Sequence, residues 1–179
     1  MRPTGEMPSG ARPEAELILR VTRVALDDAA AERALVLLRH DLDWAWLLGA
    51  AETHGVAPLL YWHLNRLAPA TVPGAVLDDL RQRFLANARH SLLLTGELLR
   101  LLPLFADHGV PAIPFKGPTL AVYAYGNLAL RQFIDLDLLI LPADLARARE
   151  LLAAEGYTFA EGEPIWCYDE CFGRVKLCC

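Results

Sequence analysis

Two aspartates, Asp135 and Asp137, stand two positions apart in the largely apolar run 133–140. This run predicts a β-strand, in which residues i and i+2 point to the same face with Cα atoms about 6.5–7 Å apart. Two carboxylates held this close repel each other, and a bound divalent cation removes that repulsion. Mg²⁺ prefers oxygen ligands and is commonly held by one or two carboxylates together with substrate phosphates. Asp135 and Asp137 are therefore the candidate catalytic residues and the candidate metal ligands.

A solvated strand face that carries the tripeptide D-x-D is the alternative interpretation of this pair. The flanking residues favour a strand over a solvent loop, because Phe133, Ile134 and Leu138 are strongly apolar. Leu136 and Leu138 alternate with the aspartates, so they are expected to face the core. The sequence thus predicts a strand over 134–141 that is buried on at least one side and presents both carboxylates on the other.

The first part of the chain predicts a helical region. Residues 1–13, rich in Pro, Gly, Arg and Glu, are expected to form a disordered tail, and helical periodicity follows over 14–109. Asp41 or Asp43 is a typical N-cap residue for one of the short helices. The region ends in a long helix over 76–107, whose leucines recur at helical spacing.

The second part of the chain, residues 110–179, predicts a mixed α/β fold. An edge-type strand over 110–115 is bounded by prolines, and the strand that carries the aspartates lies further along. The other expected elements are a helix over 118–125, a helix from Pro142 to Glu155, a strand over 157–160 and a hairpin over 165–172 and 174–177. We therefore predict an α+β protein, in which a helical N-terminal region is followed by a small mixed-sheet core.

Composition and charge narrow the functional classes. With 54% hydrophobic and 22% charged residues, the chain has enough apolar surface to fold around a core. The net charge of −5 argues against tight non-specific binding of DNA. No apolar run is long enough to span a bilayer, and the first residues lack a secretory h-region, so a cytoplasmic location without a membrane partner is expected.

All four cysteines lie within residues 167–179. Such crowding at one end of the chain does not resemble a secreted disulfide framework. A zinc site is the alternative, but the spacing C-x3-C…C-C lacks the usual paired C-x2-C units. Reduced thiols near the chain end are the interpretation that we favour.

Further motifs flank the aspartates in a fixed order. The chain reads K-G-x2-L-A at 116–121, then Tyr123 and Tyr125, then R-x3-D-x-D-x-L from Arg131, and finally Gly156-Tyr157. This order resembles the uncharacterised nucleotidyltransferases of the polymerase-β-like superfamily, and the upstream segment 43–60 is similar to the helical lead-in of that family. The resemblance covers roughly residues 35–160.

The resemblance implies a small mixed sheet flanked by helices, and a reaction that moves a nucleoside monophosphate from an NTP to an acceptor. Mg²⁺ and the release of pyrophosphate come with this reaction, and a protein, an RNA end or a small molecule stays open as the acceptor. Lys116 and Gly117 correspond to the turn that holds the triphosphate, where a glycine lets the backbone approach phosphate and a lysine supplies positive charge. A solvated lysine at a strand end is the alternative for Lys116. Arg131 is assigned to nucleotide binding through phosphate, and Asp135 or solvent are its alternative partners.

The sequence departs from the family pattern near its C-terminal end. Catalysis in the superfamily uses a third carboxylate on a neighbouring strand, which this family carries in an E-L-H-W-like strand beyond G-Y. Residues 174–179 stand where that strand is expected and contain no carboxylate side chain, so Asp169 and Glu170 are the substitutes that remain. We therefore expect a partial core, truncated at its C-terminus. A catalytically inactive binding module, or an antitoxin-like interaction protein with a protein partner, is the alternative function.

Overall fold

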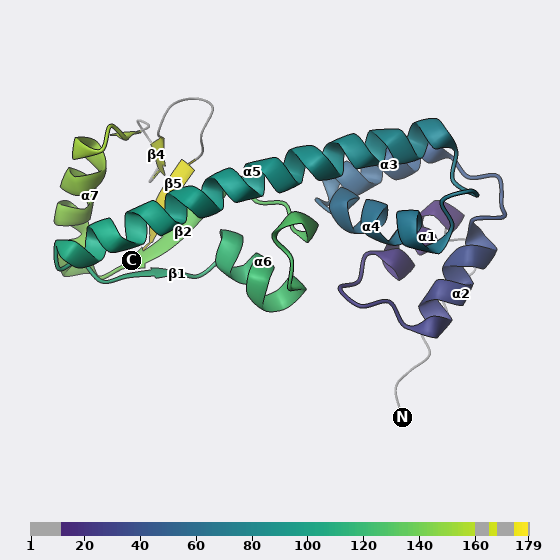
Figure 1. The fold of residues 1–179 in the computed structure, drawn as a ribbon, viewed down its shortest axis with the longest axis horizontal. Coiled ribbons are helices and arrows are strands. Elements are labelled where there is room, and N and C mark those ends of the chain that lie inside the picture. Colours follow the sequence, from purple (N-terminus) through teal and green to yellow (C-terminus); the bar gives the residue numbers. More distant parts are fainter. Residues whose placement is uncertain (1–11, 160–164, 168–173, 179) are drawn as a thin grey trace. The chain divides into compact units, whose positions relative to one another are not determined.

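The computed structural model describes residues 12–159, 165–167 and 174–178 (Figure 1). These residues form two compact units, which divide between Leu85 and Ala86. Within the described ranges, no helix combines the length and the apolar character that a bilayer crossing requires. The predicted fold class, a helical region followed by a small mixed sheet, is confirmed.

The first unit is a cluster of helices. Its elements are α1 (Pro13–Val21), α2 (Asp28–Leu37), α3 (Trp44–Thr53), α4 (Ala57–Leu67) and the first part of α5 (Gly74–Asp107). Of the expected disordered tail, only residues 12 and 13 are described, and Pro13 already begins α1. Asp43 is the N-cap of α3, because its carboxylate accepts a hydrogen bond from the Trp46 backbone N–H at 3.0 Å. Buried leucines fill the core of this unit, among them Leu17, Leu47, Leu60, Leu64 and Leu80.

The second unit contains a mixed sheet. Its described strands are β1 (Ala112–Pro114), β2 (Asp135–Ile140), β3 (Thr158–Phe159), β4 (Ile165–Cys167) and β5 (Arg174–Cys178), in the order β1-β2-β5-β4-β3. β2 pairs antiparallel with β1 and parallel with β5, and the other neighbours are antiparallel. β1 is an edge strand, as its flanking prolines predict, and β4 with β5 forms the expected hairpin pair.

Short helices connect these strands. They are α6 (Gly117–Tyr125), the 3₁₀ helix η1 (Leu128–Leu130), the 3₁₀ helix η2 (Pro142–Asp144) and α7 (Leu145–Ala154). The chain therefore runs from β1 through α6 and η1 into β2. The helix α6 and the strand β2 thus belong to one continuous segment. This connection brings the K-G motif and the two aspartates onto neighbouring elements.

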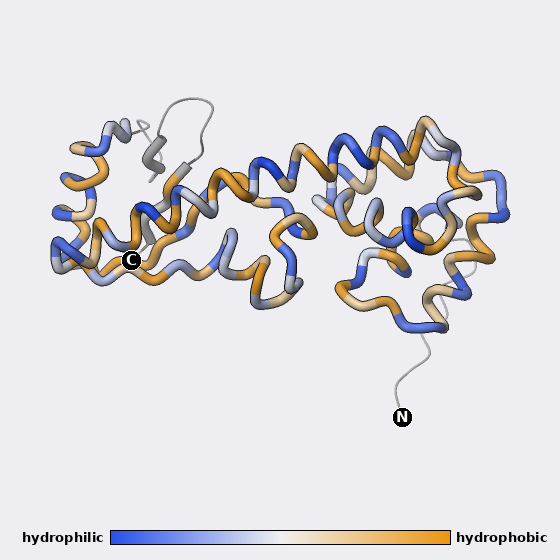
Figure 2. The backbone as a smooth tube through the Cα atoms, viewed as in Figure 1, coloured by the Kyte–Doolittle hydropathy of each residue, from blue (hydrophilic) through white to orange (hydrophobic). Residues whose placement is uncertain are grey.

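The core of the second unit lies between helices and one face of the sheet. It joins residues of α5 (Leu94, Leu98, Leu101 and Phe105), of α7 (Ala148 and Leu152) and of β2 (Leu136, Leu138 and Ile140). Hydrophobic and hydrophilic residues alternate along α5, as Figure 2 shows, which is the pattern of a helix with a buried stripe. Because this packing ties the second half of α5 to the sheet, the units divide inside α5 and not at 109/110, where the secondary structure changes.

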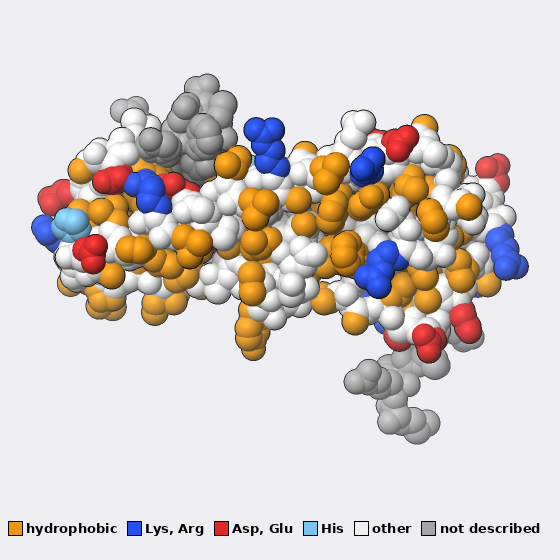
Figure 3. Space-filling model, in the orientation of Figure 1, with side chains coloured by type: hydrophobic (Ala, Val, Ile, Leu, Met, Phe, Trp, Pro, Cys, Tyr) orange, Lys and Arg blue, Asp and Glu red, His pale blue; other side chains and the backbone are white. Residues whose placement is uncertain are grey.

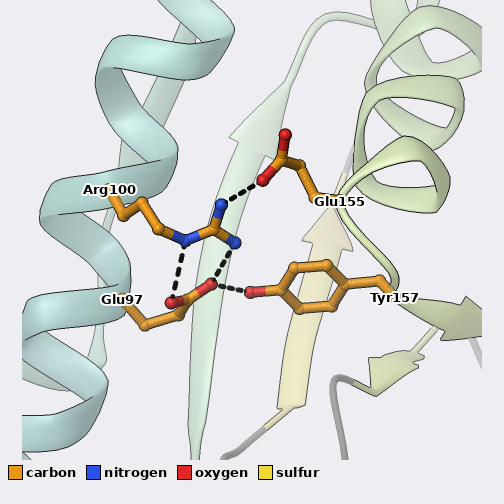
Figure 4. Close-up of polar contacts among 4 residues, drawn as sticks. All are labelled: Glu97, Arg100, Glu155 and Tyr157. Atoms are coloured by element: carbon orange, nitrogen blue, oxygen red, sulfur yellow. Dashed lines mark hydrogen bonds and ion pairs between the residues drawn. The ribbon is translucent and has the colours of Figure 1, made fainter.

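A polar network fastens α5 to the segment that follows α7 (Figure 4). The Arg100 guanidinium donates to both carboxylate oxygens of Glu97, at 3.1 and 2.7 Å, and also to Glu155. The Tyr157 hydroxyl donates to Glu97. Burial and the hydrogen bond to Glu97 both raise the pKa of Tyr157 above its ordinary value. The network thus holds Glu97 ionised and Tyr157 protonated.

We expect the Glu97→Gln variant to show a weaker dependence of stability on acidic pH than the wild type. Burial raises the pKa of Glu97, but the hydrogen bonds from Arg100 and Tyr157 outweigh it, so the pKa lies below the ordinary value of 4.5. A carboxylate with a lowered pKa stabilises the folded state above that ordinary value, and the contribution disappears as the pH falls through the lowered pKa. Urea unfolding between pH 7 and about pH 3 measures the difference.

Glu150→Gln serves as the control for this prediction, because Glu150 is an exposed carboxylate of α7 in the same unit. Its stability should fall with pH as the wild type does. An unchanged pH dependence in Glu97→Gln would show that the network contributes nothing through the charge of Glu97.

Candidate functional site

The two aspartates lie on one face of β2, and the core residues lie on the other. Asp135 is partly buried and Asp137 is only 6% exposed. Leu136 and Leu138 alternate with them and are buried in the core, as the period of a strand requires. Leu139 continues the face of the aspartates and is 38% exposed. The carboxylates therefore stand on the sheet face opposite the core, at the start of the strand.

Backbone pairing on both sides fixes the position of this strand. β1 pairs with the second half of β2, from Pro114 opposite Leu138 to Ala112 opposite Ile140. The Phe115 N–H extends this ladder by donating to the Asp137 carbonyl at 3.3 Å. On the other side, β5 pairs along the strand from the Asp135 position onward. Because its backbone groups have partners on both edges, β2 holds the aspartates in one register.

Gly117 lets α6 begin directly against β2. Its φ is +55°, in the left-handed region that glycine adopts without strain. A Cβ added at this position would lie 3.2 Å from the Asp135 carbonyl oxygen and 3.7 Å from Cδ2 of Phe133. Both the conformation and the close approach thus require glycine, and they place the first turn of α6 beside the backbone of the first aspartate.

Lys116 is the N-cap residue of α6, and its side chain reaches the second aspartate. Its Nζ lies 3.8 Å from Oδ2 of Asp137 and 5.0 Å from the centre of the Phe115 ring. The lysine side chain is 51% exposed, so solvent screens the ion pair and its contribution to stability is small. A positive charge therefore sits over the buried carboxylate on a side chain that is free to reach a nearby anion.

The N-terminus of α6 faces this same region. The first N–H groups of a helix have no acceptor within the helix, and together with the helix dipole they favour an anion. Pro118 occupies one of these early positions and brings no N–H group, which leaves those of Gly117 and Thr119 within the first turn. The helix start thus adds partial positive charge next to Lys116.

Arg131 also lies beside the start of α6. Its Nη1 donates to the Gly117 carbonyl in a long hydrogen bond of 3.5 Å, and its guanidinium carbon lies 5.7 Å over the Phe133 ring. The side chain is partly buried. The sequence leaves phosphate, Asp135 and solvent open as partners of Arg131. Its location at the helix start favours phosphate, because a planar guanidinium presents two parallel donors to phosphate oxygens.

Asn87, for which no role is predicted from the sequence, reaches the same region from α5. Its side-chain amide donates to the Ala129 carbonyl at 2.8 Å and to the Arg131 carbonyl at 3.3 Å. Its sequence context carries no distinctive signal, because α5 contains other uncharged polar residues, such as Gln82, Ser91 and Thr95. The two tyrosines of α6 differ in their environments, since Tyr123 is 90% exposed and Tyr125 is partly buried. Residues two positions apart on a helix do not face the same side, so this difference is expected.

Among the described residues, no group of three or more His, Cys, Asp or Glu side chains could hold a metal ion. The possible third carboxylates, Asp169 and Glu170, lie outside the described residues, as do Cys171 and Cys179 of the cysteine cluster. The described site therefore consists of a carboxylate pair with a positively charged edge. Apolar side chains are also exposed around this unit (Figure 3); they include Leu92, Leu99, Ile113, Val122 and Ile134.

Comparison with known proteins gives one family. The family model described as "Uncharacterised nucleotidyltransferase" matches residues 40–173, which is well over half of the chain. This range contains the K-G motif, Arg131 and both aspartates. No curated protein and no solved structure matches the chain.

Proposed function

Since the chain belongs to the uncharacterised nucleotidyltransferase family, we propose that it moves a nucleoside monophosphate from an NTP to an acceptor hydroxyl, with Mg²⁺ as cofactor. Family membership supports nucleotidyl transfer as the general class of reaction. The observation that carries the finer proposal is that negatively charged and positively charged groups lie close together where α6 begins beside β2. The Asp137 carboxylate lies 3.8 Å from the Lys116 ammonium, and the backbone of Asp135 lies against Gly117 at the start of α6. Arg131 reaches the same helix start by donating to the Gly117 carbonyl.

The carboxylate pair fits a hard divalent cation. Asp135 and Asp137 offer oxygen ligands from one face of a strand, and the ammonium of Lys116 already lies 3.8 Å from Asp137. Mg²⁺ is held in many sites by one or two carboxylates, with water and substrate phosphates completing its shell. When bound between the pair and an NTP, it would neutralise charge on the phosphate oxygens.

The triphosphate would lie across the start of α6. Lys116 supplies a mobile positive charge, the N–H groups of the first turn supply partial charge, and Arg131 supplies a planar pair of donors. Asp137 is the counter-ion of Lys116 in this structure. In the proposed complex, the Lys116 side chain moves away from Asp137 and pairs with a phosphate oxygen instead. The lysine side chain can make this movement because it is half exposed.

The reaction forms one bond and breaks one. The acceptor oxygen bonds to the α-phosphorus of the NTP, and the bond from that phosphorus to the bridging oxygen of the β-phosphate breaks. Pyrophosphate leaves with the electron pair, and a base takes the proton of the acceptor hydroxyl. Orientation by Lys116 and Arg131 keeps the leaving pyrophosphate on the side of α6, opposite the approach of the acceptor.

The acceptor is a protein, an RNA end or a small molecule, and the cytoplasm supplies all three together with NTP and Mg²⁺. A catalytically inactive binding module remains the alternative. It shares nucleotide binding with the proposed enzyme, but it predicts no transfer of label from an α-labelled NTP. Transfer that depends on Asp137 would eliminate this alternative.

We expect the Lys116→Ala variant to bind MgNTP about 10- to 150-fold more weakly than the wild type. The variant removes one charge-assisted contact to phosphate, which is worth about 1.5–3 kcal/mol. Isothermal titration of the wild type with ATP, GTP, CTP and UTP, each with Mg²⁺, identifies the nucleotide and provides the reference affinity.

Arg147→Ala is the control, because it removes the same charge from an exposed position on α7. Its affinity for the same nucleotide should equal that of the wild type. The proposed function is wrong if the wild type binds none of the four nucleotides, and the role of Lys116 is wrong if Lys116→Ala binds as tightly as the wild type.

A further inference from the structure

The turn between α6 and β2 determines where Arg131 enters the site. Gly126 ends α6 in the left-handed conformation, with φ at +65°. Asn127 then begins η1, and its side chain accepts a hydrogen bond from the Ala129 N–H at 2.9 Å. Leu130 is buried, and Arg131 continues in extended backbone toward β2. The local turn chemistry thus shapes η1 but leaves its carbonyl groups to other partners.

Asn87 of α5 donates to the Ala129 carbonyl of η1 and to the carbonyl of Arg131, which follows η1. Its Nδ2 lies 2.8 Å from the Ala129 oxygen and 3.3 Å from the Arg131 oxygen. Both acceptors are carbonyl groups, so the amide uses both of its N–H donors on one turn. Asn87 is partly buried, which strengthens the two hydrogen bonds relative to solvent-exposed ones. A residue distant in sequence therefore clamps the backbone of the arginine itself.

We propose that Asn87 is a positioning residue for the triphosphate group of a nucleotide, and that it acts through Arg131. This inference rests on the proposed function and deepens it. Within the described residues, the guanidinium of Arg131 donates a long hydrogen bond to the Gly117 carbonyl and lies over the Phe133 ring. Asn87 restrains the backbone of Arg131, and this backbone is the point from which the arginine side chain extends.

Preorganisation is the physical reason that this clamp matters. Bidentate recognition of phosphate needs the planar guanidinium in one orientation, and each restrained torsion lowers the entropy lost on binding. Without the two amide hydrogen bonds, the turn at 127–131 gains freedom and two carbonyl groups lose their partners. Arg131 then meets the phosphate from a wider range of positions, and the affinity for the triphosphate falls.

The test is a double-mutant cycle on the affinity for MgNTP. We expect Asn87→Ala to weaken binding of the tightest of the four nucleotides by about tenfold, and Arg131→Ala to weaken it at least as much. The double variant should bind no more weakly than Arg131→Ala alone, because the effect of Asn87 passes through Arg131. A merely structural role would instead lower the affinity in the presence and in the absence of Arg131.

Two further variants keep the result interpretable. Asn87→Gln retains both amide donors and should recover part of the lost affinity, whereas Asn65→Asp changes an exposed amide of α4 and should bind as the wild type. Thermal unfolding shows that each variant titrated is folded. Wild-type affinity in Asn87→Ala, or additive losses in the cycle, would overturn this inference and leave the proposed function standing. Absence of nucleotide binding by the wild type would overturn both.

Discussion

The Asp137→Asn variant is expected to lose Mg²⁺-dependent nucleotidyl transfer by about a thousandfold, the scale on which removal of one preorganised electrostatic group acts. Asp137 is buried, and β2 is held by backbone pairing on both sides. The position of its carboxylate is therefore restricted. Asparagine keeps the size of the side chain but removes the negative charge that a divalent cation needs. Release of pyrophosphate, and transfer of label from an α-labelled NTP to pooled cellular RNA, protein and small hydroxyl compounds, measure the loss.

Titration of Mg²⁺ in the presence of the bound nucleotide gives a second readout for Asp137→Asn, which does not depend on the acceptor. The Mg²⁺ affinity should fall with the transfer rate. Asp107→Asn is the matched control, because it makes the same change at an exposed position in the same unit and should keep the wild-type affinity. If Asp137→Asn binds Mg²⁺ as the wild type does, then Asp137 is not a metal ligand. If the wild type binds nucleotide but transfers no label to any acceptor, the binding-module alternative is favoured.

The Gly117→Ala variant should be less stable than the wild type by about 1–3 kcal/mol, and it should also bind MgNTP more weakly. Two costs add at this position. Alanine is strained at a φ of +55°, and its Cβ would stand 3.2 Å from the Asp135 carbonyl oxygen. That oxygen belongs to a strand paired on both edges, so it cannot move away cheaply, and the start of α6 must move instead. Urea unfolding measures the stability, and isothermal titration measures the affinity.

Gly109→Ala separates the two costs in this prediction. Gly109 has a φ of +71°, but nothing lies within 4 Å of a Cβ built on it. It should therefore lose stability of about 1 kcal/mol from backbone strain alone, with nucleotide affinity unchanged. Equal losses of stability in the two variants would mean that the contact between Gly117 and Asp135 carries no strain, and that α6 is not held against β2 by that contact.

The sequence by itself determined the elements of the site. The alternation of Asp135, Leu136, Asp137 and Leu138 defines a strand with carboxylates on one face, because the period of two is a property of extended backbone. Asp43 as the N-cap of α3 and the prolines that flank β1 are signals of the same local kind. Such patterns depend on residues a few positions apart, so they can be recognised in the sequence without knowledge of the tertiary structure.

The tertiary structure alone decided how these elements meet. The approach of Gly117 to the Asp135 carbonyl, the reach of Lys116 to Asp137 and the clamp of Asn87 on Arg131 all join separate elements. The same is true of the assignment of the second half of α5 to the sheet core. Periodicity states which face of an element is apolar, but the choice of partner depends on packing between elements that are distant in the chain. A glycine, a lysine and an asparagine thus make these contacts only in the folded chain, where separate elements come together.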